Sequence, residues 1–372
     1  MSSIMIVLLM VISSGARYLG IVSYLALSIL IVINVFKNSH KNKRYVIIFA
    51  LLTIFLANSF YTLYLGDNID PVVGNFLLQI LFLLTLDYKK EQPRLVLEAM
   101  KWQILLSILL GLVGYIGINN SMLIDAGSAK GFSGFYALAG IFATPQLLAS
   151  VCIAFLLFQP VFGGNISRND IYNNICKYTA LGVMLLSLNR VNILFYMLWK
   201  IVTLLKRKFG GMLILFCMAF FGVILCSITI SYLSLDGTLL QTVQSRLALI
   251  LGVISTIDFN DVWQLLFGVF NSIHFYLPEY FVDINYIENG FLFIFKYFGI
   301  LGLITYVAFT SLLAIALFRE GYKLLALYAI FYLIVVQNFT NEFVSFIFPQ
   351  IIYLLMYCAY VKNRDVIVLN KG

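Results

Sequence analysis

The stretch LLSLNRVNILFYMLW (residues 185–199) places one arginine, Arg190, in the middle of a run of apolar side chains. Its polar tip, SLNRVN, separates two short apolar arms, a pattern that predicts a helical hairpin. A charged side chain at the depth of a bilayer costs about 3 kcal/mol, so a charge found there is rarely without function. The interpretation of Arg190 depends on which side of a membrane this tip faces.

The composition of the whole chain is that of a membrane protein. Of its 372 residues, 62% are hydrophobic and only 11% are charged, and the mean hydropathy is +0.99. A water-soluble domain carries about 25% charged residues, so a soluble globule is excluded. The five cysteines lie in apolar stretches without CxxC spacing, and there are only two histidines. We therefore expect neither a disulfide framework nor a bound metal or other cofactor.

The apolar runs predict an all-α polytopic membrane protein whose residues 1–372 form one integral domain. A helix needs about 20 apolar residues to cross a bilayer, and fewer within a bundle. Residues 4–14 are a candidate extra span, preferred over a cleaved signal peptide because they lack a basic segment and a second apolar run follows. The other expected spans, which bring the total to eleven or twelve, are 17–36, 45–65, 71–87, 101–118, 135–158, 175–189, 191–206, 212–232, 300–318, 322–338 and 343–360.

The basic residues indicate which side each connection faces. If 37–44 (KNSHKNKR) is cytoplasmic and the sides alternate, eighteen Lys and Arg residues fall on the cytoplasmic side and five on the outer side. The C-terminus is then cytoplasmic, and the net charge of +8 reflects retention at the inner face. A nucleic-acid partner is not needed to explain it. The five outer basic residues are Arg17, Lys130, Arg190, Arg246 and Lys296.

Two outer segments are expected to be loops. Residues 233–299 form the large extracytoplasmic loop, with a re-entrant end, and mix polar runs such as IDFNDVWQ with aromatic ones such as HFYLPEYF. Residues 119–134 form a smaller loop. Long ordered loops often carry function, so the large one is the expected place for a site. No internal repeat is visible in the sequence, which argues against a transporter built from matching halves.

Arg190 lies on the outer side in this topology, at or slightly below the membrane surface. One interpretation is that its side chain extends to lipid head groups. The other is that it binds an anion, because a guanidinium forms bidentate hydrogen bonds with phosphate and stays charged. Arg246 could complete a clamp on a diphosphate, and Lys130 is either a weaker third candidate or an ordinary surface lysine. Since there is no ATP outside the membrane, such an anion would arrive on a lipid, as a polyprenyl-diphosphate sugar carrier.

Four motifs, in this order, resemble the bacterial O-antigen polymerase (Wzy) family, within the wider group that includes O-antigen ligases. KGFSGFYALAGIFATPQLLAS (130–150) is similar to a basic-x-x-Gly loop that runs into a span. SLNR (187–190) is similar to a Ser-x-Ser-Arg hairpin tip, with Asn189 at the third position. SRLALI…DVWQLLFGVF (245–270) resembles a loop arginine followed by a Trp and an apolar-Gly turn. YIENGFLFIFKYFGILGLI (286–304) resembles the closing re-entrant segment.

The resemblance, which covers residues 130–320, implies a GT-C-like bundle in the bacterial inner membrane. It also implies a metal-independent glycosyltransferase that passes the growing saccharide from undecaprenyl diphosphate to a sugar hydroxyl of a new lipid-linked unit at the periplasmic face. Arg190 and Arg246 would stabilise the leaving diphosphate. Glu288 would act as the base. The expected substrate-binding residues are Lys130, Asn289, His274, Trp263 and Tyr286.

Structural explanations stay open for several of these residues. Glu288 could be solvated, or belong to the first turn of a helix beginning near 289, where an acid suits the helix dipole. His274 could be a base or a hydrogen-bonding loop residue. Asp258 and Asp261 could hold a divalent ion, although exposed helix-end charges commonly show the same spacing.

A polymerase is the leading hypothesis, and two alternatives stay open: a related enzyme and a transporter. An O-antigen ligase is a sister enzyme, although ligases usually carry His-Asn where this chain has Glu288-Asn289. A lipid-linked oligosaccharide flippase or other transporter is the second alternative. The expected partners are an undecaprenyl-diphosphate-linked oligosaccharide and membrane lipids, with a chain-length regulator as a further candidate.

Overall fold

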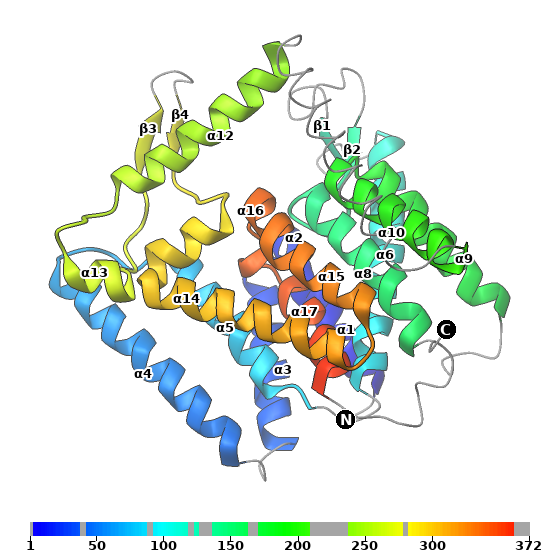
Figure 1. Ribbon diagram of the computed structural model, residues 1–372, viewed down its shortest axis with the longest axis horizontal. Helices are drawn as coiled ribbons and strands as arrows, with labels where there is room; N and C mark the ends of the chain where they lie inside the picture. The colour runs from blue at the N-terminus through cyan, green and yellow to red at the C-terminus, as the bar shows by residue number, and fades with distance from the viewer. Residues whose placement is uncertain are drawn as a thin grey trace.

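A computed structural model of the chain describes residues 3–37, 42–87, 92–117, 123–125, 136–162, 170–208, 237–277 and 282–360, which are mostly helical (Figure 1). The first helices are α1 (Ser3–Ser14), α2 (Ala16–Leu19), α3 (Ile21–Lys37), α4 (Asn42–Tyr64), α5 (Pro71–Thr85) and α6 (Gln92–Tyr115). The next are α8 (Pro145–Phe162), α9 (Asp170–Leu186), α10 (Arg190–Lys208), α12 (Gly237–Ser255) and α13 (Val262–Phe267). The last are α14 (Gly290–Arg319), α15 (Lys323–Ile330), α16 (Gln337–Thr340) and α17 (Ile347–Tyr360), with a π-helical segment (Phe331–Val336) joining α15 to α16 and a 3₁₀ turn (Glu342–Val344) before α17.

The helical membrane character predicted from composition is confirmed. In the described residues, five helices are long and apolar enough to cross a membrane, and six shorter apolar helices of 10–17 residues accompany them. The number of crossings and the side that each connection faces stay predictions. The expected span 212–232 lies outside the described residues.

The centre of the molecule is built by α8 and α17, which are buried on nearly every side. A helix that is apolar all round is suited to such a position, because no face of it prefers water. α17 contacts α5, α6, α8 and α14, so it joins the first and second halves of the chain. Figure 1 shows α17 in the middle of the bundle.

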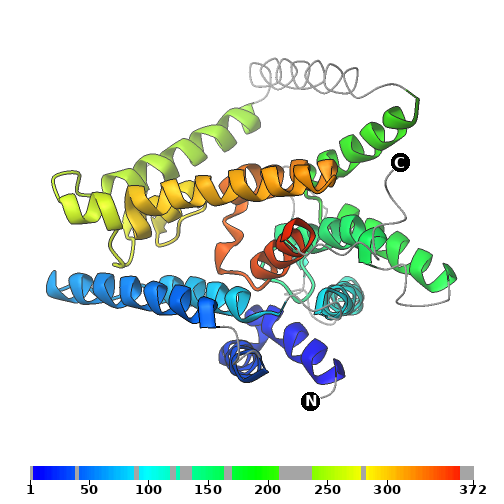
Figure 2. The same ribbon diagram turned by 60° about the horizontal axis from the view of Figure 1, so that its bottom comes forward.

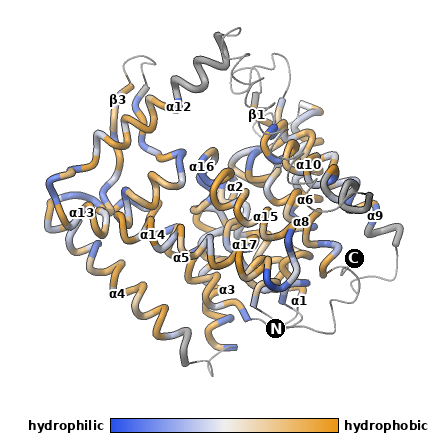
Figure 3. Tube along the Cα trace, viewed as in Figure 1, coloured by the Kyte–Doolittle hydropathy of each residue, from blue (hydrophilic) through white to orange (hydrophobic). Residues whose placement is uncertain are grey.

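The helix α4 shows the opposite pattern, because large apolar side chains such as Phe49, Ile54 and Phe60 are exposed along it. Figure 3 shows that most residues along this helix are apolar. Its C-terminal end is attached to the segment around α13. The Asn58 amide donates to the Phe267 carbonyl at 2.8 Å, and the Thr62 hydroxyl accepts from the backbone N–H of Phe270 at 3.0 Å. An exposed apolar helix of this length is suited to contact with lipid tails.

Two expected spans include a glycine that breaks the helix near its start. The span expected at 17–36 is divided by Gly20, whose φ of 49° ends α2 before α3 begins. The span expected at 135–158 begins only at Pro145, since residues 136–138 form strand β2 (Tyr136–Leu138), paired with β1 (Leu123–Asp125). Gly140 prevents a longer helix: its φ is 60°, and an added Cβ would lie 2.2 Å from Cβ of Ser107.

The segment expected to be a large loop, 233–299, contains regular structure where it is described. It holds α12, α13 and the hairpin of β3 (Phe275–Leu277) and β4 (Val282–Ile284). The helix α12 contacts α14 and β3, and Figure 2 shows α12 above α14 in that view. The sequence interpretation did not include α12 because polar residues in QTVQSR were taken as loop residues, whereas a structureless loop of that length is rare.

The end of this segment is fixed by two glycines in close contact. Gly268, which ends α13, has φ 79°, and Gly299, within α14, has φ 63°. An added Cβ on Gly268 would lie 2.2 Å from the backbone of Tyr297, and one on Gly299 would lie 2.4 Å from the backbone of Leu266. The two backbones therefore touch, and α14 is bent at the boundary between the expected re-entrant stretch and the expected span.

Candidate functional site

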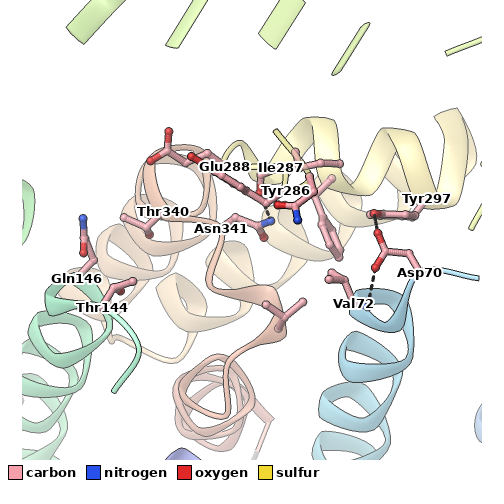
Figure 4. Close-up of a pocket in the computed structure, with 13 residues that line it drawn as sticks. Asp70, Val72, Thr144, Gln146, Tyr286, Ile287, Glu288, Tyr297, Thr340 and Asn341 are labelled. Carbon is pink, nitrogen blue, oxygen red and sulfur yellow. Dashed lines mark hydrogen bonds between the residues drawn. The ribbon is translucent and has the colours of Figure 1, made fainter. Parts of the chain in front are cut away.

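A pocket of about 290 Å³ lies where five segments of the chain meet (Figure 4). Its volume is close to the lower limit for small-molecule sites, which suits one ring-sized unit of a ligand. The walls are the starts of α5 and α8, the segment before α14, the first turns of α14, and the turn between α16 and α17. The lining residues are Asp70, Val72, Thr144, Gln146, Asn285, Tyr286, Ile287, Glu288, Phe293, Tyr297, Thr340, Asn341 and Val344.

Three helices begin at this pocket, each after a polar residue that accepts a backbone hydrogen bond. Asp70 caps α5 by accepting from the N–H two residues on at 2.9 Å. Asn289 caps α14 by accepting from the N–H three residues on at 3.0 Å. The Thr144 hydroxyl accepts from the N–H three residues on, at the start of α8, at 3.4 Å. Since helix N-termini carry partial positive charge, electron-rich oxygen atoms are favoured here.

Two carboxylates, those of Asp70 and Glu288, line the pocket. Asp70 is the more buried of them, with 6% of its surface exposed. One oxygen caps α5, and the other accepts a 2.5 Å hydrogen bond from the Tyr297 hydroxyl on α14 (Figure 4). Its backbone N–H donates to the carbonyl of Phe270 at 2.7 Å. Asp70 thus holds together three segments at one side of the pocket. The sequence interpretation missed this residue, whose only signal was an acid directly before Pro71.

Glu288, the predicted base, lines the same pocket. Figure 4 shows its carboxylate at the rim, on the side away from Asp70. Within the described residues, no hydrogen bond or ion pair engages this carboxylate. Tyr286, predicted to bind substrate, also lines the pocket and is 53% exposed. Partial burial and the negative charge of Glu288 raise the pKa of Tyr286, so its hydroxyl stays protonated and able to donate.

Asn289, predicted to bind substrate, is a helix-capping residue in the structure. Its side-chain oxygen is used as the N-cap of α14, which begins at Gly290, and Asn289 is not among the residues that line the pocket. The helix start predicted near 289 is therefore present, directly after Glu288. Gly290 is closely packed there, since an added Cβ would lie 2.7 Å from the carbonyl of Gln337.

Arg246 lies on α12, and its guanidinium carbon is 4.8 Å from the centre of the Phe339 ring on α16. Such a cation–π contact fixes the position of a charged group beside an aromatic face. Phe339 is followed directly by Thr340 and Asn341, which line the pocket. The structure thus brings Arg246 to the segment that forms one wall of the pocket containing Glu288.

Arg190 is exposed at the first position of α10, directly after the turn that ends α9. It does not line the pocket. Its neighbours in the tip are buried: the Asn189 side chain accepts from the backbone N–H of Asn192 at 3.1 Å, and Ser187 is fully buried. The predicted hairpin is therefore present, and its arginine occupies the helix start.

The segment QNFTNE (337–342) is the part of the site that the sequence interpretation did not find. The Asn338 side chain accepts from the N–H of Phe291 at 3.0 Å, and the Asn341 amide donates to the carbonyl of Ile287 at 2.6 Å. Both bonds attach this segment to the start of α14. The signal in the sequence was a polar run with an acid, Glu342, between two apolar spans.

Trp263 lies away from the pocket. Its indole N–H donates to the Asn58 side chain at 3.1 Å, and its ring packs against Tyr61 and Phe267. Asp261 is the N-cap of α13 and accepts a 2.6 Å hydrogen bond from the Tyr61 hydroxyl, which accounts for this acid as a helix-end charge. These contacts fix α13 on α4.

His274 and Lys130 are the remaining predicted site residues. His274 is exposed directly before β3 and does not line the pocket, and Lys130 lies outside the described residues. Lys296, expected only as an outer basic residue, is 2% exposed and donates to Asn271 at 2.6 Å, which in turn donates to Asp67 at 2.8 Å. Within the described ranges, no three His, Cys, Asp or Glu side chains are grouped as a metal site would require.

No protein-family model and no curated protein sequence matches this chain.

Proposed function

We propose that the chain is a polysaccharide polymerase that joins undecaprenyl-diphosphate-linked oligosaccharide units at the periplasmic face of a bacterial inner membrane. The proposal is supported by the four motifs that resemble O-antigen polymerases and by one structural observation. Arg246 is held over Phe339, next to Thr340 and Asn341, which line one pocket together with Glu288. A guanidinium that contacts Phe339 and a carboxylate that has no hydrogen bond or ion pair among the described residues therefore lie near the same wall of one pocket.

In the proposed reaction, the acceptor sugar occupies the pocket and one of its hydroxyl groups faces Glu288. The carboxylate takes the hydroxyl proton while the oxygen forms a bond to the anomeric carbon of the donor saccharide. The bond from that carbon to the diphosphate oxygen breaks, and the electron pair leaves with the diphosphate. Arg246, beside the pocket wall, stabilises the charge that develops there. Arg190 is the second arginine to which we assign this role. Tyr286 offers a ring face and a hydroxyl donor to the sugar.

A deletion strain complemented with Arg246→Ala or Glu288→Gln tests this proposal. We expect single repeat units in place of the ladder of long polysaccharide chains on a gel, with unchanged amounts of protein in the membrane. Arg319→Ala and Glu320→Gln, at the opposite end of α14, are matched controls and should keep the ladder. Full ladders in both test variants would overturn the mechanism. Full-length polymer accumulating on the undecaprenyl carrier in the deletion strain would instead indicate a ligase.

A further inference from the structure

Two turns of the chain share an unusual backbone conformation. Among the described residues other than glycine, only Leu188 and Asn341 have positive φ, at 52° and 40°. This left-handed conformation costs an ordinary residue about 1–2 kcal/mol, so surrounding contacts must hold it in place. Leu188 lies two residues before Arg190, and Asn341 lines the pocket.

A path of hydrogen bonds connects these turns. Asn192, whose backbone N–H donates to the Asn189 side chain, donates through its own amide to the Ser150 hydroxyl at 3.2 Å. The Ser150 hydroxyl donates to Oε1 of Glu342 at 2.7 Å. Glu342 directly follows Asn341. The path therefore runs from the tip of the α9–α10 hairpin, through α8, to the turn at the pocket.

Glu342 is completely buried, with 0% of its surface exposed. The Tyr332 hydroxyl donates to its second oxygen at 2.8 Å, Thr340 donates at 3.4 Å, and its own backbone N–H donates to the Gln337 side chain at 2.9 Å. Within the described residues, no lysine or arginine pairs with it. A buried carboxylate held only by hydroxyl groups contributes little to stability compared with an apolar residue of similar size. We therefore interpret the Glu342 carboxylate as a group that holds the side chains bonded to it in position.

We propose that Glu342 is a positioning residue, whose buried carboxylate joins the turn that carries Arg190 to the turn that lines the pocket. The same segment carries Phe339, on which Arg246 rests. The carboxylate is therefore connected by hydrogen bonds to the turn that carries Arg190, and it lies three residues after the phenylalanine that Arg246 contacts. The consequence for polysaccharide synthesis rests on the proposed function, whereas the connection between the two turns does not.

A matched pair of variants separates this positioning from a general contribution to stability. Ser150→Ala removes the hydroxyl that connects Glu342 to Asn192. Tyr332→Phe removes a hydrogen bond to the same carboxylate that is not part of the path to the hairpin tip. In hydrogen exchange of the purified protein in lipid nanodiscs, Ser150→Ala should speed exchange in residues 187–193 by about tenfold, the loss expected for one hydrogen bond. Tyr332→Phe should leave that turn unchanged. Both variants should loosen residues 337–345.

Equal effects of the two variants on residues 187–193, or no effect of either, would overturn the inference. If Ser150→Ala does not fold, Asn192→Ala can be used instead. It removes the hydrogen bond from the Asn192 amide to Ser150 and should affect the same turn. The polysaccharide ladder supplies the second measurement, in which Ser150→Ala should lower the yield of long chains about tenfold and Tyr332→Phe should lower it much less. Equal losses of yield would also overturn the inference. If the unaltered protein makes no polymer, the proposed function fails, while the exchange measurement still decides whether Glu342 joins the turns.

Discussion

The hydroxyl of Tyr297 donates a 2.5 Å hydrogen bond to Oδ2 of Asp70 and so joins α14 to the first turn of α5 beside the pocket. The other oxygen of Asp70 caps α5. Glu288, in contrast, lines the pocket without a bond to another described residue. The two carboxylates therefore differ in use: Asp70 shapes the wall, and Glu288 is available to a ligand.

Tyr297→Phe should lower the free energy of unfolding by about 1–3 kcal/mol, because Asp70 loses a buried hydrogen bond to its charge. The thermal unfolding midpoint of the purified protein in detergent measures this loss. Tyr276→Phe is the matched control, since Tyr276 is 53% exposed on β3. Equal shifts of the midpoint in the two variants would show that the hydrogen bond from Tyr297 to Asp70 does not stabilise the fold.

Gly299→Ala should destabilise the protein by about 3 kcal/mol or more, because a side chain there would combine a left-handed conformation with a collision against the backbone of Leu266. Gly321→Ala isolates the first effect. Gly321 also has positive φ, 89°, but has open space around the position of a Cβ, so its replacement should cost only about 1 kcal/mol. Chemical or thermal unfolding of both variants gives the comparison, and similar losses would show that α13 and α14 are not in backbone contact.

Trp263 should behave as an anchor for α13. A double-mutant cycle of Trp263→Phe and Asn58→Ala should give a coupling free energy of about 1 kcal/mol in thermal unfolding, since each change removes the same hydrogen bond. The Trp263→Phe variant should keep the polysaccharide ladder. Trp102→Phe, on α6, controls for the loss of an indole at a partly exposed site. Additive effects in the cycle would contradict the anchor.

Burial raises the pKa of Glu342 to about 7, against the opposing effect of the hydroxyl groups of Ser150, Tyr332 and Thr340. Glutamate in an unfolded chain has a pKa near 4.3. Between this pH and pH 7, the folded protein therefore holds a proton on Glu342 that the unfolded chain has released. Stability should therefore fall as pH rises from about 4.5 to about 7 and change no further through this group above that range.

Glu342→Gln should remove this part of the pH dependence. The unfolding midpoint of the unaltered protein should decrease between pH 5 and pH 8, and the variant should show a flatter profile over the same range. Asp283→Asn, at an exposed carboxylate on β4, serves as the control and should keep the original slope. Parallel profiles for the unaltered protein and Glu342→Gln would show that Glu342 is not a titrating group in this range.

The helical membrane fold could be predicted from apolar runs because a helix satisfies its own backbone within the segment. The α9–α10 hairpin and the helix start after Glu288 followed from the same reasoning. The division at Gly20 and the late start at Pro145 could not be found in this way, since hydropathy does not register a left-handed glycine. The helix α12 was missed because its polar residues were interpreted as those of a loop.

The site was predicted in part, and the missing part depends on contacts between distant segments. Glu288 and Tyr286, which belong to one short motif of the sequence, both line the pocket. Asp70 and Asn341 line it too, although more than two hundred residues separate them in the sequence. Only the packing of α5 beside the turn before α17 brings them together. Trp263, in turn, is accounted for by its bond to Asn58, a pairing that no local pattern indicates.

The π-helical segment Phe331–Val336 holds one residue more than a regular helix would need to connect the same two ends. An α-helix turns about 100° per residue, so deleting a single residue there would rotate α15 against α16 by that angle. If α16 kept its place, Tyr328 would turn away from Phe158 and Phe195. If α15 kept its place, Thr340 would turn out of the cavity wall. The number of residues in this short segment therefore determines both the packing of Tyr328 inside the bundle and the position of Thr340 in the pocket wall.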